Sequence, residues 1–157
     1  MRTLPELFAE CDLHLLALQE AMARCPHPLT PSHFVPRNPE LVAAVDQFAY
    51  RFAKLQDVIS VQLFRRFALD VLREPVESSP IIDILNLLER YRYLPSVARW
   101  QEIREIRNQI THEYQIDPQE LSVVLRIAFG MATEMSSIVA SLRHHATGKT
   151  RDRANTP

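Results

Sequence analysis

Apolar residues recur every three to four positions along several stretches of the chain, the spacing of amphipathic helices. The first stretch runs from about residue 4 to 25, and its stripe comprises Leu4, Leu7, Phe8, Cys11, Leu15, Leu18 and Met22. Similar stretches cover about 39–73, 80–94, 97–114 and 118–145. None shows the alternation of a strand. We therefore predict an all-α fold, an up-and-down bundle of about five helices with short connections.

Proline directly after a capping residue marks the predicted start of the later helices. These pairs are Asn38-Pro39, Ser79-Pro80 and Asp117-Pro118. Proline suits the first helical position because its missing N–H is not needed there. Glu120 lies three residues after Asp117, which resembles a capping box. Between the first two helices the proline-rich segment 26–36 predicts an extended connector.

The chain of 157 residues has the length of one domain. Within it, residues 1–38 are expected to form a helix and a proline-rich connector that pack on the bundle, and residues 39–146 its helical core. Residues 147–157 are polar and contain Gly148 and Pro157, which predicts a disordered tail. Two glycines and eleven prolines between apolar runs also favour helices over turn-rich sheets.

Composition and charge narrow the possible partners. The chain is 46% hydrophobic and 24% charged, with a formal charge of −1 and a pI near 6.6. A broad basic surface for nucleic acid is not indicated, although a small cationic site is possible. We expect neither a metal nor a cofactor, because the connector residues His27 and His33 have no cysteine or carboxylate beside them.

The location is predicted to be cytoplasmic. Cys11 and Cys25 fall on one predicted helix, where fourteen residues span roughly 21 Å, too far for a disulfide bond. This suits a reducing cytosol. Glu6, Glu10 and Asp12 interrupt what would be the apolar core of a signal peptide. No run approaches the roughly 20 apolar residues of a membrane span, so no membrane partner is expected.

Polar groups concentrate between residues 104 and 117. Ile103, Ile106, Ile110 and Tyr114 share one face of the predicted helix, and Arg107 borders this face. Asn108 and His112 are i, i+4 neighbours that can touch. Arg107 and His112 are five positions apart, roughly 140° around an ideal helix. A two-fold axis beside this helix would bring both pairs to one cleft, which predicts a homodimer.

These groups suit RNA cleavage without a metal. The ribose 2′-hydroxyl can attack the adjacent phosphorus if a base takes its proton and a cation stabilises the phosphate. Histidine titrates near neutral pH and can serve as base or acid. Arginine stays charged and binds two phosphate oxygens at once. An amide such as that of Asn108 can hold the imidazole or a phosphate oxygen.

The same residue types are also compatible with purely structural roles. His112 can stabilise the last turn of its helix through the helix dipole. Arg107 can pair with a nearby glutamate, and Tyr114 can be a core residue whose hydroxyl reaches the surface. On the earlier helix, Arg51, Lys54 and Asp57 can form a solvated i, i+3 charge ladder.

The sequence Arg107-Asn-Gln-Ile-Thr-His112-Glu-Tyr114 has the pattern R-x4-H-x-Y with a polar residue after the arginine. In this it resembles HEPN-domain toxins of the HepT type, which are partners of minimal nucleotidyltransferase (MNT) antitoxins. Arg51-Phe-Ala-Lys-Leu-Gln-Asp57 also looks like a stretch from members of that family. The resemblance covers roughly residues 39–145.

The resemblance implies a homodimeric, metal-independent ribonuclease toxin with RNA as its substrate. By position, Arg107 would stabilise the phosphate and His112 would be the general acid and base. Asn108 would support them, and Asp57 would approach the same cleft. Tyr114 would be the hydroxyl that the antitoxin modifies with AMP. Some similar proteins are instead non-catalytic binding or regulatory partners of a nucleotidyltransferase, which is the alternative function.

Overall fold

The computed structural model describes the backbone of residues 1–112 and 117–154 and the side chains of residues 1–111 and 117–148. Every regular element in these ranges is helical, so the predicted all-α bundle is confirmed. The elements are α1 (Leu4–Ala23), η1 (Pro31–Phe34), α2 (Pro39–Val58), η2 (Ile59–Leu63), α3 (Phe64–Phe67), η3 (Ala68–Leu72), α4 (Ile81–Arg90), α5 (Val97–His112) and α6 (Pro118–Ala154).

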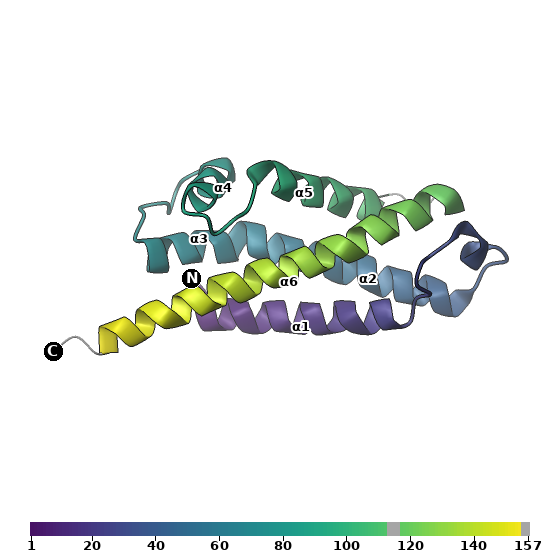
Figure 1. Ribbon diagram of the computed structural model, residues 1–157, viewed down its shortest axis with the longest axis horizontal. Coiled ribbons are helices and arrows are strands. Elements are labelled where there is room, and N and C mark those ends of the chain that lie inside the picture. The colour runs from purple at the N-terminus through teal and green to yellow at the C-terminus, as the bar shows by residue number, and fades with distance from the viewer. Residues whose placement is uncertain (113–116, 155–157) are drawn as a thin grey trace.

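The long helices run back and forth along one axis (Figure 1). Helix α1 and the segment from α2 to η3 run in opposite directions and pack against each other. Helix α4 lies at one end, and α5 returns along the bundle above α2. Helix α6 crosses the front of the molecule diagonally and contacts both α1 and α5. The start of α1 and the end of α6 lie towards the same end.

The second predicted helix is continuous from Pro39 to Leu72, close to the predicted end near Arg73. Asn38 caps it as expected, since its Oδ1 accepts hydrogen bonds from the backbone N–H groups of Glu40 and Leu41. Two π-helical segments, η2 and η3, interrupt the α-helical pattern without ending the helix. Arg73 then ends the helix in the left-handed conformation with φ at 61°.

Helix α1 contributes fully to the core. Its buried residues include a strict three-four repeat, namely Leu4, Leu7, Cys11, His14, Leu18 and Ala21. Leu15 and Met22 of the predicted stripe are only partly buried. One continuous core extends from Leu4 on α1 to Leu142 on α6. Residues 1–38 therefore share their core with the rest of the bundle.

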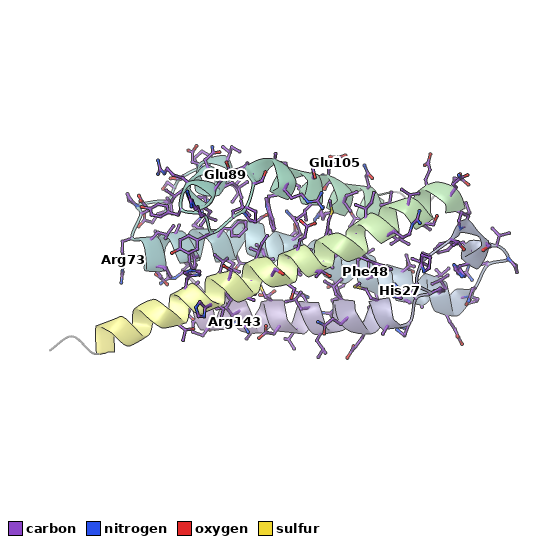
Figure 2. All side chains as sticks on the ribbon, viewed as in Figure 1. His27, Phe48, Arg73, Glu89, Glu105 and Arg143 are labelled. Atoms are coloured by element: carbon purple, nitrogen blue, oxygen red, sulfur yellow. The ribbon has the colours of Figure 1, made fainter. Side chains whose placement is uncertain are left out.

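The connector after α1 is fixed to the bundle by aromatic contacts. Phe48 on α2 and Phe129 on α6 meet edge to face with 4.7 Å between ring centroids. The ring of His27 lies 5.5 Å from that of Phe129, and Figure 2 shows His27 and Phe48 where α6 passes over α2. The connector is not extended throughout, because residues Pro31–Phe34 form a 3-10 turn.

Two sequence-based expectations are wrong at helix ends. Helix α4 begins at Ile81, one residue later than predicted, and Pro80 itself occupies the capping position without a side-chain hydrogen bond. Helix α6 continues to Ala154, beyond its predicted end near residue 145. Gly148 costs only about 1 kcal/mol in a helix, and the segment has no proline before residue 157. Thr147 also bonds back to the carbonyl of Arg143 at 2.8 Å.

Residues Pro118–Gly148 of α6 are long and apolar enough to cross a membrane by length and composition alone, because an 18-residue window within them has a mean hydropathy of 1.5. Within the bundle, 44% of this apolar window is buried against protein. Core helices of soluble proteins meet the same criteria. The cytoplasmic location stays a prediction.

Candidate functional site

Helix α5 packs mainly against α2, and its start also contacts η2 and α3. Ser96 caps its start, with the Ser96 hydroxyl accepting from the backbone N–H of Arg99 at 3.1 Å. The buried Trp100 donates from its indole nitrogen to the hydroxyl of Ser60 at 2.9 Å and meets the ring of Phe64 edge to face at 4.9 Å. Ile103 and Ile106 continue the buried face as predicted. These contacts fix the position of α5 up to Arg107.

Arg107 lies at the boundary between α5 and α2. Its Nη2 donates to Oδ2 of Asp57 at 2.9 Å, and its Nη1 donates to Oδ1 of Asn108 at 3.2 Å. The Arg107 side chain is 24% exposed, and its buried Nε has no hydrogen-bond partner among the described residues. The structure therefore brings together three of the predicted site residues, Arg107, Asn108 and Asp57.

The contact between Asp57 and Arg107 differs from a simple charge ladder on α2. Asp57 pairs across the helices, and Arg51 turns to the opposite side, where its Nη1 lies 3.2 Å from Nδ1 of His14. Lys54 is exposed, and its ammonium lies 5.6 Å from the centre of the Tyr50 ring. Arg51 thus contacts His14 on α1, whereas Lys54 and Asp57 both line one groove.

Beside Arg107 is a groove of about 690 Å³ between α2, the end of α5, the start of α6 and the η1 region. Its charged and aromatic lining is Phe34, Arg37, Asp46, Tyr50, Lys54, Asp57 and Arg107. Ile110 and Thr111 form part of the floor. The Thr111 hydroxyl donates to the carbonyl of Arg107 at 2.8 Å, so this hydroxyl stabilises its own helix.

His112 is the last residue of α5, and its side chain lies outside the described residues. Tyr114 lies outside them altogether. The predicted contact between Asn108 and His112 and the roles of both residues stay predictions. Because α5 is continuous through His112, its backbone carries Arg107 and His112 about 140° apart around the helix axis.

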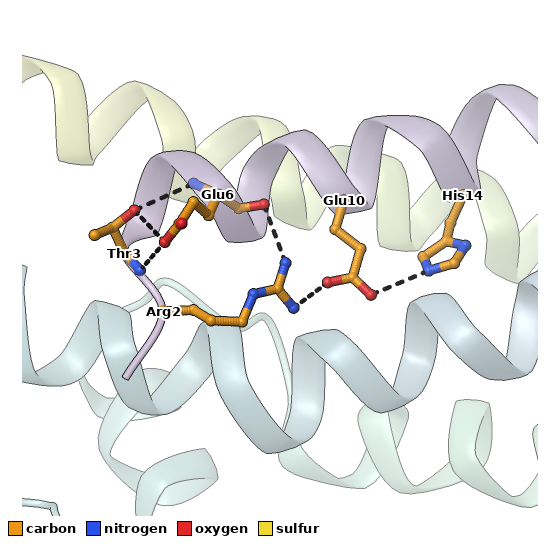
Figure 3. A network of polar contacts seen from close by, with 5 residues as sticks. All are labelled: Arg2, Thr3, Glu6, Glu10 and His14. Carbon is orange, nitrogen blue, oxygen red and sulfur yellow. Dashed lines mark hydrogen bonds and ion pairs between the residues drawn. The ribbon is translucent and has the colours of Figure 1, made fainter.

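Sequence reasoning missed a second polar cluster, between α1 and α2. His14 is 8% exposed, and its Nδ1 accepts a hydrogen bond from Arg51. Its Nε2 lies 3.5 Å from Oε1 of Glu10, and Glu10 also pairs with Arg2 (Figure 3). The three-four repeat could have indicated that His14 is buried, because His14 falls between Cys11 and Leu18 in it. Since histidine is polar, it was not counted among the apolar positions of the helix.

Burial sets the protonation of this cluster and of the nearby cysteine. Burial lowers the pKa of His14, and the charge of Arg51 adds to this effect although Glu10 opposes it. Burial also raises the pKa of the Cys11 thiol to about 12, with Glu10 and Asp12 adding to the rise. Cys11 is therefore a core residue rather than a nucleophile.

Among the side chains that the structure describes, no group of three or more His, Cys, Asp and Glu residues could hold a metal ion. At the groove, α2 and α5 present the carboxylate of Asp57 and the guanidinium of Arg107, which also bonds to the amide of Asn108. Such a set can bind and orient an anion such as phosphate.

The sequence matches no protein-family model, and it matches no curated protein and no solved structure.

Proposed function

We propose that this protein is a metal-independent ribonuclease toxin of the HEPN type, with Arg107 and His112 as its catalytic residues. The observation that supports this best is the position of Arg107. It is held by Asp57 and Asn108 at the edge of an open groove, five residues before His112 on the same helix. A guanidinium fixed beside a groove is suited to a phosphate of RNA.

In the proposed reaction, neutral His112 takes the proton of a ribose 2′-hydroxyl. The 2′-oxygen then forms a bond to the neighbouring phosphorus, and the bond from phosphorus to the 5′-oxygen of the next nucleotide breaks. A protonated histidine gives that leaving oxygen its proton. Arg107 stabilises the charge on the phosphate oxygens. The products are a 2′,3′-cyclic phosphate and a 5′-hydroxyl end.

The two groups reach one phosphate most readily across a homodimer. On a single ideal helix, positions 107 and 112 are about 140° apart, but a two-fold axis beside α5 would place each next to its counterpart in the other copy. Regulation would follow from Tyr114, two residues after His112. An MNT-type nucleotidyltransferase antitoxin would attach AMP to its hydroxyl and add bulk and negative charge at the cleft.

Expression in a bacterial host tests the function. Wild type should slow growth and degrade cellular RNA, whereas Arg107→Ala and His112→Ala should do neither. Arg104→Ala is a matched control because Arg104 lies on the exposed side of α5. Toxicity of His112→Ala equal to that of wild type would refute the assignment. Co-expression with a cognate nucleotidyltransferase should add the mass of AMP to Tyr114.

A second candidate function is that of a non-catalytic partner of a nucleotidyltransferase. The ion pair of Arg107 with Asp57 favours it, because this contact also joins α2 to α5 and gives Arg107 a structural role. This function predicts a stable complex with the nucleotidyltransferase and unchanged cellular RNA whatever residue stands at position 112.

A further inference from the structure

We infer that the groove beside Arg107 contains a binding subsite for one unpaired nucleotide of a single-stranded RNA. The base stacks on Tyr50. Lys54 and Arg37 contact the phosphate backbone. The inference rests on the proposed function, because it assigns the part of the substrate that flanks the phosphate held at Arg107. None of the three residues belongs to the R-x4-H-x-Y pattern.

Tyr50 has the properties of a stacking surface. Its side chain lines the groove and is 57% exposed, although most aromatic residues of the chain are buried in the core. The guanidinium of Arg51 and the ammonium of Lys54 each lie 5.6 Å from its ring centre. Both cations lie over the ring, so a base that stacks on Tyr50 displaces a flexible cationic side chain from that face and leaves it beside the base, where it can contact the phosphate.

The regular geometry of α2 aligns this subsite with Arg107. Tyr50, Lys54 and Asp57 are separated by four and three residues, so they form one row along the helix. The row spans about 10.5 Å along the axis, from the ring at one end to the Asp57–Arg107 pair at the other. An RNA strand that follows this row passes from the ring of Tyr50 over Lys54 to Arg107.

The charges of the groove favour a polyanion at this end. Asp57 is paired with Arg107, whereas Arg37 and Lys54 form no ion pair among the described side chains. Asp46 is the other carboxylate in the lining. Two cations that are free to bind and one exposed aromatic ring are the combination that binds single strands without reading their sequence. Paired bases in a duplex cannot stack on the ring.

The test uses a fluorescent 12-nucleotide 2′-O-methyl RNA, which cannot be cleaved because its 2′-oxygen is blocked. Binding to the full-length protein is measured by fluorescence anisotropy over a range of salt concentrations. Tyr50→Ala should weaken binding about fivefold or more. Lys54→Gln should weaken it and lower the slope of log affinity against log salt by about one, and Lys54→Arg should restore both.

Tyr91→Ala and Arg126→Gln are matched controls, since both residues are exposed and lie outside the groove. Both variants should bind like wild type. Equal affinity of wild type, Tyr50→Ala and Lys54→Gln would overturn the subsite, as would equal affinity for a duplex of the same length. Thermal melting of each variant checks that its fold is intact.

The outcomes separate the subsite from the catalytic assignment. If Tyr50→Ala binds and cleaves like wild type while His112→Ala is inactive, the subsite is wrong and the ribonuclease assignment holds. If Tyr50→Ala loses binding while His112→Ala cleaves RNA at the wild-type rate, the subsite holds and the role of His112 is wrong.

Discussion

Asp57 and Arg107 are fifty positions apart in the sequence, yet their side chains meet at 2.9 Å. The helical pattern placed Arg107 at the border of the apolar face of α5, where the structure has it half-buried. It could not show that α2 would bring Asp57 to the same place. Asp57 was expected there only from the family resemblance, because a contact between distant helices depends on packing that local spacing does not encode.

A double-mutant cycle with Asp57→Asn and Arg107→Gln should give a coupling energy below about 1 kcal/mol in urea unfolding. The pair is partly exposed, so solvent weakens the attraction and side-chain entropy offsets it. Its main effect is expected to be on orientation. Asp57→Asn should lower RNA cleavage while unfolding changes little. A coupling energy of several kcal/mol would mean that the pair is chiefly structural.

The buried His14 predicts how stability changes with pH. Arginine can only donate, so Nδ1 of His14 accepts from Arg51 and the neutral ring carries its proton on Nε2, which faces Glu10. Protonation of Nδ1 would remove the acceptor and place an N–H donor opposite the N–H donor of Arg51. The groups that face this ring are Glu10, Arg51 and Lys54.

Because the folded pKa of His14 is lowered, the unfolded chain binds the proton first as the pH falls. The contribution of His14 to the free energy of unfolding should be fully present above the unfolded pKa near 6.5. Below that pH the free energy of unfolding should decrease by at most about 1.4 kcal/mol per pH unit. His14→Gln should flatten this dependence between pH 7 and 5.5 in urea titrations. His144→Gln, at an exposed position, should not. An identical pH dependence in wild type and His14→Gln would contradict the assignment.

The helices themselves were the most predictable feature. Apolar spacing and proline-marked starts located α1 and the starts of α2 and α6 within a few residues, because helix formation depends on local pattern. The π-helical segments η2 and η3 had no such signal. They arise where the long helix accommodates neighbours, as where Ser60 on η2 receives the indole N–H of Trp100. Such contacts exist only after the bundle has formed.

The end of α4 offers a prediction for a single element. Arg92 adopts φ 63°, and the N–H groups of Arg92 and Tyr93 bond to the carbonyls of Glu89 and Leu88 at 2.9 Å each. This is a Schellman motif with arginine where glycine is preferred. Arg92→Gly should therefore raise the free energy of unfolding by about 0.5–1 kcal/mol in urea titrations. Arg90→Gly, two residues earlier and in helical conformation, should lower it by about 1 kcal/mol. A loss of stability in Arg92→Gly would contradict the motif.

Helix α1 forms one side of the bundle and shares its hydrophobic core. Leu18 is 1% exposed and belongs to the common core, whereas Leu16 on the same helix is 54% exposed. Leu18→Ala should cost about 2–5 kcal/mol of unfolding free energy, because it leaves a cavity in the core. Leu16→Ala should cost less than about 0.5 kcal/mol. Similar losses in the two variants would mean that α1 does not pack as described.

The same packing decides where a site can form. The core fixes α2 and α5 relative to each other and leaves the groove between them open on the side of Tyr50 and Lys54. Residue spacing predicted the polar cluster on α5 but not this groove, which needs α2, α5, α6 and η1 together. The separation of Arg107 and His112 around one helix remains the reason to expect a homodimer.

The proposed cleavage of RNA by Arg107 and His112 is tested by the rate at which purified protein cuts a 5′-labelled RNA in the presence of EDTA. We expect wild type and Arg104→Ala to cut it and to leave 2′,3′-cyclic phosphate ends. Arg107→Ala and His112→Ala should each be slower by about 100-fold or more. Cleavage by His112→Ala at the wild-type rate, or no cleavage by a folded wild type, would contradict the claim.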